Sequence, residues 1–208
     1  MRPELHDLRR DKILRAAHAA FVGKGFTRTR MEEVARGARV ANATVYAYFD
    51  TKEILFEAVV AQALASYDGL FDAVEKTASD DVARSLTAYG RVYFRFMADP
   101  TVRGIYRTVS AETVHKPELG MMLYRSAHRL LGGVLQRMLT RYTEQDLLAI
   151  AEIPVAARMF EGMIEHVTLT ISMLQGDTAQ PLHPAETYVP EVVRAFLAAH
   201  KPGAASRP

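Results

Sequence analysis

The chain contains no cysteine among its 208 residues. This absence excludes disulfide bonds, thiolate nucleophiles and cysteine-ligated zinc, and it fits a reducing compartment. No uninterrupted apolar run approaches the roughly 18 residues that a membrane-spanning helix needs, and the N-terminus lacks the apolar core of a signal peptide. We therefore expect a cytoplasmic protein that does not insert into a membrane.

Patterns typical of catalysis are also scarce. The sequence has no Ser/His/Asp or Cys/His set and no phosphate-binding glycine loop. One Glu-x-x-His motif, at Glu112 and His115, resembles the motif of di-iron helix bundles, but those sites need two copies. The other residues that could join such a site are Glu161, Glu165 and His166. We expect no enzyme, no metal and no cofactor.

Charge is distributed unevenly along the chain. The net charge is only +2, but residues 1–56 contain 11 Lys and Arg against 7 Asp and Glu, which gives +4. The remainder then has 15 against 17, or −2. An excess of positive charge at one end favours a nucleic-acid contact there. With 49% hydrophobic residues, the rest of the chain can build a large core.

Apolar residues recur at helical spacing throughout, and neither a strand pattern nor an internal repeat is present. We predict an all-α protein with a three-helix N-terminal domain (1–55), a larger helical domain (56–200) and a disordered tail (201–208). Prolines and polar caps divide the larger part. The expected helices cover about 8–23, 51–77, 80–99, 100–110, 117–142, a short stretch from Thr143, 154–174 and a last helix around 189–197.

Residues 25–55 predict a helix-turn-helix followed directly by a third helix. Thr29 and Glu32 have the spacing of a capping box, which indicates that a helix begins here. A second short helix is expected from Asn42 to Phe49, with Val45 and Phe49 packed inward. Its outer face, the candidate for DNA recognition, would present Asn42, Thr44, Tyr46 and Tyr48.

These residues resemble the DNA-binding domain of the TetR family of bacterial transcription regulators, over roughly Asp11 to Val60. The similarity lies in the run ILRAAHAAFVGKGF, in Glu33-Val34-Ala35, and above all in TVYAYF followed by TKEIL. Three positions depart from the family pattern. Arg39 replaces a glycine that ends the second helix, so a residue with a β-carbon would adopt a left-handed conformation. Ala41 replaces a serine cap, which could pass the cap to Asn42, and Ala43 replaces a frequent glycine or proline.

The resemblance implies roles for individual residues. Tyr46, Tyr48 and Lys52 match positions that hold the DNA backbone, and phenols and ammonium groups suit phosphate oxygens. Arg28, Thr29 and Arg30 are further candidates for phosphate contacts. Asn42 and Thr44 are the candidates for base edges, because asparagine can pair with adenine and the threonine methyl can meet thymine.

The resemblance also implies a homodimer, paired through the last long helices, that binds a palindromic operator on double-stranded DNA. Apolar residues on several faces of 155–174 agree, because one chain cannot cover them all. The larger domain would bind a small, largely apolar molecule that releases a repressor by tilting the long helix 51–77. A DNA-binding dimer without such an effector remains the alternative. The candidate ligand-binding residues are Tyr93, Phe96, Tyr106, Tyr124, His128, Met159 and Met163.

Overall fold

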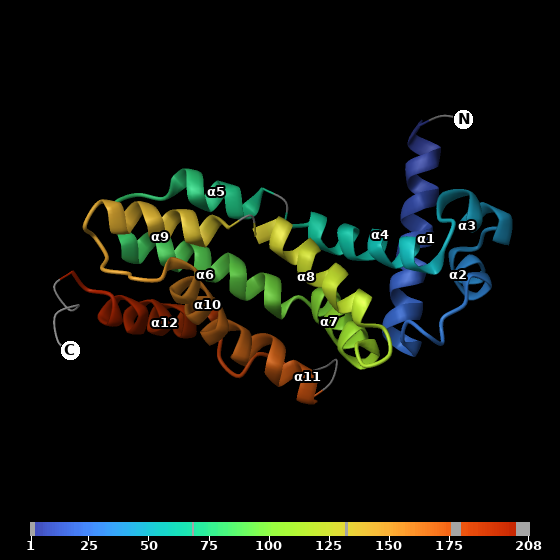
Figure 1. Cartoon of the computed structure of the whole chain (residues 1–208). Helices are drawn as coiled ribbons and strands as arrows, with labels where there is room; N and C mark the ends of the chain where they lie inside the picture. The colour runs from blue at the N-terminus through green and yellow to red at the C-terminus, as the bar shows by residue number, and fades with distance from the viewer. Residues whose placement is uncertain (1–2, 68, 132, 176–179, 203–208) are drawn as a thin grey trace. The chain divides into compact units, whose positions relative to one another are not determined.

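The computed structural model describes residues 3–67, 69–131, 133–175 and 180–202 (Figure 1). Every regular element in these ranges is a helix, which confirms the predicted all-α class. The chain divides into two compact units: unit 1 comprises Met1–Ser66 and Gly104–Ala127, and unit 2 comprises Tyr67–Arg103 and His128–Pro208. Most of the predicted tail, residues 203–208, lies outside the described residues.

Unit 1 contains four complete helices and the parts of two others. Phe21, Phe26 and Phe56 form its aromatic centre, with ring centroids 5.0–5.6 Å apart. All three side chains are buried, as are the inward residues of the helix-turn-helix, Val45 and Phe49. The helices are α1 (Pro3–Lys24), α2 (Met31–Ala38), α3 (Asn42–Tyr48), α4 (Lys52–Ala65), the greater part of α7 (Pro100–Glu112) and most of α8 (Pro117–Leu131).

The turn between α2 and α3 has the geometry expected from the sequence. Arg39 adopts the left-handed conformation with φ 58° and ψ 46°. Its N–H donates to Arg36 O at 3.2 Å, and the N–H of Val40 donates to Ala35 O at 3.0 Å, so these two carbonyls near the end of α2 are satisfied. A side chain with a β-carbon makes this conformation costly by about 1 kcal/mol relative to glycine.

The predicted capping box at Thr29 and Glu32 is wrong. Helix α2 begins at Met31, and Arg30 occupies the N-cap position without a side-chain cap. The Thr29 side chain is turned inward and buried, where its hydroxyl donates toward Gly25 O at 2.8 Å and Ala20 O at 3.1 Å. The Thr29 hydroxyl, which was predicted to cap α2, thus donates to two carbonyls near the end of α1 instead.

The predicted continuous helix 51–77 is also wrong, because it is divided into α4 and α5 (Leu70–Thr77). Gly69 lies between them with φ 74°, a left-handed value that helices do not contain. Thr51 caps α4 by accepting a hydrogen bond from Ile54 N at 3.2 Å. The stretch 52–77 is long and apolar enough to cross a membrane by composition, but Leu55, Phe56 and Val59 are buried in unit 1.

Unit 2 is built from α5, α6 (Val82–Ala98), the start of α7 and the end of α8, and from the helices α9 (Val134–Glu144), α10 (Ile153–Glu165), η1 (His166–Thr170), α11 (Ile171–Gln175) and α12 (Ala185–Ala199). The short η1 segment is a π-helical turn. Pro100 and Pro117 open helices as predicted. Thr143 does not begin a new helix; it lies within α9, and its hydroxyl donates to Leu139 O. The predicted helix 117–142 is divided by Gly133, which has φ 67°.

Candidate nucleic-acid interface and effector region

Helix α3 presents the predicted recognition residues in graded exposure. Val45 and Phe49 are buried and attach the helix to the core of unit 1, whereas Asn42 is exposed and Thr44 is half-buried. Ala41, not Asn42, occupies the N-cap position, and no side chain caps the helix. The Asn42 amide therefore has no part in capping.

The two tyrosines of α3 differ in their surroundings. Tyr46 is 44% exposed, and its hydroxyl lies 3.5 Å from a Glu32 carboxylate oxygen, a long contact that a phosphate could replace. Tyr48 is half-buried, donates to His6 O at 3.2 Å and packs on the His6 ring at 4.6 Å between centroids. Tyr48 therefore joins the N-terminal part of α1 to α3.

Two arginines flank the inward-facing Thr29. Arg28 is exposed, and its Nε donates to Lys24 O at 2.7 Å, so the end of α1 orients the guanidinium. Arg30 is exposed at the N-cap position of α2. Because the hydroxyl of Thr29 is used internally, these guanidinium groups are the more accessible donors near the start of α2.

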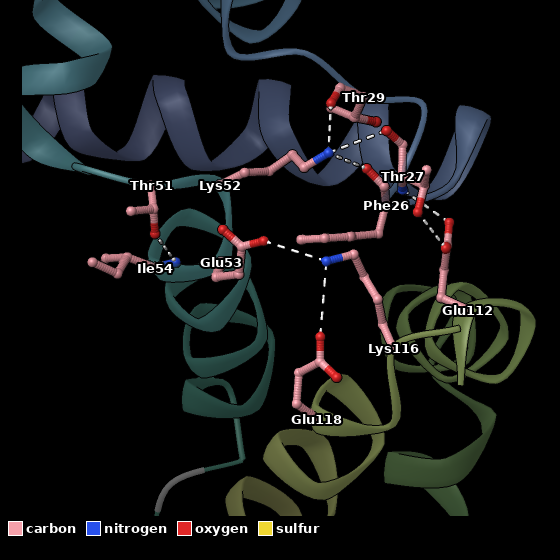
Figure 2. A network of polar contacts seen from close by, with 10 residues as sticks. All are labelled: Phe26, Thr27, Thr29, Thr51, Lys52, Glu53, Ile54, Glu112, Lys116 and Glu118. Carbon is pink, nitrogen blue, oxygen red and sulfur yellow. Dashed lines mark hydrogen bonds and ion pairs between the residues drawn. The ribbon is translucent and has the colours of Figure 1, made fainter. Parts of the chain in front are cut away.

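Lys52, at the start of α4, holds the connection between α1 and α2 (Figure 2). Its ammonium donates to the carbonyl oxygens of Phe26, Thr27 and Thr29 at 3.0, 3.1 and 3.1 Å. It also lies 4.6 Å from the centre of the Phe26 ring. Burial lowers the pKa of Lys52. The predicted phosphate contact of Lys52 stays a prediction, and it would compete with three backbone acceptors.

A second group of polar contacts joins the end of α7 to the segment between α1 and α2 (Figure 2). The Glu112 carboxylate accepts hydrogen bonds from Thr27 N at 2.9 Å and from the Thr27 hydroxyl at 2.6 Å. A β-carbon on Gly25 would lie 3.2 Å from the same carboxylate, so glycine gives Glu112 room. Glu112 thus joins the end of α7 to the connection between α1 and α2.

Lys116 extends these contacts. Its ammonium pairs with Glu53 at 3.7 Å and with Glu118 at 3.8 Å, and it lies 5.5 Å from the centre of the Phe26 ring. Phe26 therefore lies between two lysines, one from α4 and one from the α7–α8 connection. All of these residues belong to unit 1.

The predicted effector residues are distributed over both units. Tyr106 and Tyr124 belong to unit 1, where the first is half-buried and the second is 50% exposed. The other five belong to unit 2: Tyr93 and Phe96 are buried, Met163 is half-buried, and His128 and Met159 are exposed. Their role in binding a ligand stays a prediction.

Unit 2 also contains two tyrosine–glutamate pairs on facing turns of α6 and α10. The Tyr89 hydroxyl donates to Glu161 at 2.6 Å, and the Tyr93 hydroxyl donates to Glu165. Burial raises the pKa of both phenols and of Glu161. The two phenol rings stack with centroids 6.0 Å apart, inside an aromatic cluster that includes Phe71, Phe96 and Phe160.

Models of protein families match two parts of the chain. Residues 13–59 match the model described as bacterial regulatory proteins, tetR family, and residues 84–202 match that of the AefR-like transcriptional repressor, C-terminal domain. The second match alone covers more than half of the chain. The chain belongs to the TetR family.

Known proteins similar to this TetR-family regulator include the HTH-type transcriptional repressor NicS of Pseudomonas putida, 37% identical over 68 residues. That alignment covers 33% of the chain and 32% of the relative, so it spans about a third of the relative's length. A TetR-family transcriptional regulator from Mesorhizobium loti superposes with a TM-score of 0.79 at 25% identity, over 94% of this chain and 98% of that one.

Two further structures share the fold of this TetR-family regulator. The flavonoid-responsive regulator FrrA has a TM-score of 0.70 at 22% identity, over 95% of this chain and all of the other. The transcriptional regulator FadR from Bacillus subtilis, solved in complex with stearoyl-CoA, has a TM-score of 0.66 at 17% identity, over 90% and 95% of the two chains.

Sequence reasoning missed the tyrosine–glutamate pairs of this TetR-family regulator. It considered Glu161 and Glu165 only as possible metal ligands. A signal was nevertheless present, because Tyr89 and Tyr93 are four residues apart, as are Glu161 and Glu165, and matched spacing on two helices permits two parallel pairs. The partnership of Glu112 with Thr27, 85 residues away in sequence, had no comparable signal.

Proposed function

We propose that the chain is a homodimeric repressor whose two copies of α3 bind a palindromic operator, and that a small, largely apolar molecule releases it. The observation that carries the DNA-binding part is the exposed polar face of α3. The side chains of Asn42 and Tyr46 are exposed, so neither stabilises the core of unit 1. The bases and phosphates of a major groove fit such a face.

A second copy of the chain is proposed to cover α10. Val155 and Met159, four residues apart on this helix, are 53% and 60% exposed. Two large apolar side chains at helical spacing favour burial against another molecule. A twofold dimer would also place two copies of α3 on two half-sites, which one helix of seven residues cannot specify alone.

The effector is proposed to bind in unit 2, where a buried aromatic cluster includes a few polar groups. The rings of Tyr89, Tyr93 and Phe96 supply apolar contact, and the carboxylates of Glu161 and Glu165 supply hydrogen-bond acceptors. If these side chains separate to admit a ligand, this combination suits a largely apolar molecule with hydroxyl or amide donors. The flavonoid-responsive FrrA and the stearoyl-CoA complex of FadR support a ligand of this general character.

The signal is proposed to reach the DNA-binding helices through α7 and α8, because the long helix 51–77 is interrupted. Helix α7 begins in unit 2 at Pro100 and ends in unit 1 at Glu112, whose carboxylate holds Thr27. A ligand that shifts α7 would thereby move the connection between α1 and α2. Release requires only that the ligand bind the shifted state more tightly.

Selection of bound duplexes from random DNA by the full chain tests the DNA-binding part. We expect a palindromic sequence with half-sites about one helical turn or more apart. The matched control is the Asn42→Ala, Thr44→Ala double variant, which should retain non-specific binding but lose the selected preference. Failure of the wild-type chain to enrich any sequence would reject the proposal.

A library of small apolar and amphipathic molecules, screened against the selected operator, tests the effector part. The expected hit raises the melting temperature of the protein and lowers its operator affinity. The Tyr93→Phe variant, which keeps the ring but loses the hydrogen bond to Glu165, should respond less. Operator binding that no compound alters would favour a dimer without a small-molecule effector.

A further inference from the structure

Unit 1 contains a groove whose lining residues, apart from Thr44, are not among the predicted DNA contacts. It has a volume of about 710 Å³ and lies between the outer face of α1 and the turn that connects α2 to α3. The lining contains four cationic side chains and no acidic one: Arg9, Lys12, Arg15 and Arg39. The remaining lining residues are small or apolar apart from Thr44: Ala16, Gly37, Ala38, Val40 and Ala41.

Three of the cations form a row on one face of α1. Arg9, Lys12 and Arg15 are exposed and occur at intervals of three residues, so successive turns of the helix place them side by side. With a rise of 1.5 Å per residue, the row spans roughly 9 Å. One DNA strand carries a phosphate about every 3.4 Å along the axis and also winds around that axis, so neighbouring phosphates lie farther apart than this rise and the row can reach about two of them.

Two acidic residues of α1, Asp7 and Asp11, do not line this groove. Asp11 accepts a hydrogen bond from the Gln62 amide of α4 at 3.0 Å, and Asp7 lies 3.7 Å from His6. Neither carboxylate is part of the lining. The charged side chains that line the groove are therefore all positive.

The fourth cation comes from the helix-turn-helix itself. Arg39 holds a left-handed conformation that glycine would adopt at lower cost, and its exposed side chain lines the groove. Gly37 brings α2 close to α1 here, since a β-carbon on it would lie 3.3 Å from Ala16 Cβ. The groove continues to Thr44 on α3, so a polymer seated in it would also reach the recognition helix.

We propose that this groove binds the DNA backbone beside the half-site that α3 contacts, with Arg9, Lys12, Arg15 and Arg39 holding consecutive phosphates. The inference rests on the proposed function and extends its footprint on DNA. A linear row of cations that leads to Thr44 suits a continuous polyanion. A free phosphate or nucleotide would instead favour donors that converge on one point.

The test compares the wild-type chain with the Lys12→Gln, Arg15→Gln double variant on two duplexes that carry the selected operator. One duplex ends at the outer edges of the half-sites, and the other has ten additional base pairs on each side. A matched control, Arg84→Gln, removes an exposed positive charge from unit 2. Circular dichroism verifies that all variants fold.

On the long duplex, the double variant should bind roughly tenfold or more weakly for each positive charge removed. The slope of the logarithm of the operator association constant against the logarithm of salt concentration should decrease in magnitude. The decrease should be about one for each phosphate that the variant no longer neutralises in a half-site. On the short duplex the double variant and the wild type should bind alike, and the sequence preference should not change. The Arg84→Gln control should match the wild type on both duplexes.

Three results would overturn the proposal. Equal affinities of the double variant and the wild type on the long duplex would remove the groove from DNA. Equal reductions in affinity on both duplexes would place the groove inside the half-site. Tight binding of inorganic pyrophosphate, abolished in the double variant while operator affinity is kept, would identify the groove as a small-anion site. A wild-type chain that selects no operator rejects the proposed function as well, whereas the first three results leave it intact.

Discussion

The side chain of Asn42 could either cap α3 or contact DNA. The sequence left two roles open, because Ala41 lacks the side chain that could cap α3 and the Asn42 amide could replace it. The structure places Ala41 at the N-cap position and Asn42 exposed in the first turn, with no side-chain cap. The Asn42 amide is thus available to DNA.

We predict that Asn42→Ala relaxes base preference at one operator position by roughly 1 to 3 kcal/mol, because the variant has no amide to pair with a base edge. The melting temperature should hardly change, since no cap is removed. Binding to a panel of operators with single base changes, together with thermal unfolding, measures both quantities.

The control is Tyr46→Phe, which removes a phenol hydroxyl near Glu32 and would weaken binding to all operators of the panel by a similar factor. A large fall in the melting temperature of Asn42→Ala with unchanged base preference would mean that Asn42 supports the helix and does not contact bases.

Glu112 carries a prediction about stability and pH. Burial raises the pKa of this carboxyl, but the hydrogen bonds from the hydroxyl and N–H of Thr27 and the nearby charge of Lys52 lower it by more. The net pKa lies below the ordinary value of 4.5. The group therefore stabilises the fold fully above about pH 4.5, and this contribution is lost as the pH falls through the lower, folded-state pKa.

Glu112→Gln should accordingly destabilise the protein by about 1 to 2 kcal/mol at neutral pH, because one carboxylate acceptor becomes an amide. The difference from the wild type should shrink below pH 4.5. Chemical denaturation at a series of pH values measures it, with Glu118→Gln as the control for an exposed glutamate. A difference that is constant across this range would show that the charge of Glu112 is immaterial.

Residue roles were harder to predict than residue positions. The sequence correctly indicated that Val45 and Phe49 pack inward, because apolar residues at helical spacing carry that information. It could not indicate that the Thr29 hydroxyl would donate to carbonyls near and just after the end of α1, or that the Lys52 ammonium would donate to three carbonyls. These partners meet only in the folded chain.

At the scale of elements, Gly90 determines how closely α6 and α12 pack. A β-carbon at this position would lie 2.7 Å from Val189 Cγ1, and Val189 is a buried, branched side chain that cannot turn away easily. Gly90→Ala should therefore destabilise the protein by about 1 to 3 kcal/mol, although alanine favours helices. Thermal unfolding measures the change.

Gly23→Ala is the matched control, since Gly23 lies in α1 with no atom within 4 Å of the added β-carbon. It should stabilise the protein by roughly 0.5 to 1 kcal/mol through helix propensity. If both substitutions stabilise the protein, α6 and α12 can move apart to accept a β-carbon at position 90, and the prediction for Gly90 is wrong.

Most element boundaries followed from local chemistry. Pro100 and Pro117 open helices because proline is favoured in the first turn, and Arg39 adopts the conformation that its place after α2 requires. Two helices that were predicted to be continuous are divided at Gly69 and Gly133, where the chain turns left-handed between two apolar stretches. An isolated glycine inside an apolar pattern is compatible with a continuous helix, so the sequence alone did not separate the two outcomes.

At the scale of the whole molecule, the division into units does not follow the order of the sequence. Unit 1 includes the segment 104–127, which is separated from the helix-turn-helix by the first part of unit 2. The charge pattern and the family resemblance located the DNA-binding helices. They could not reveal that α7 returns to them, because the contact between Glu112 and Thr27 joins residues with no shared local pattern.

The last prediction concerns the assembly. If α10 pairs with its copy, Met159→Glu places a charge in an apolar contact, and twofold symmetry repeats it in both chains. The dimer dissociation constant should rise on the order of 100-fold, with a parallel loss of operator affinity, because an unpaired buried charge costs several kcal/mol. Sedimentation at several protein concentrations measures the first quantity, and operator titration measures the second.

The control is Met121→Glu. Met121 is a methionine of α8 that is 53% exposed, and its substitution should leave both quantities unchanged. A Met159→Glu protein that remains dimeric but no longer responds to an inducer would assign Met159 to the effector site; one that remains dimeric and responsive would place it in neither.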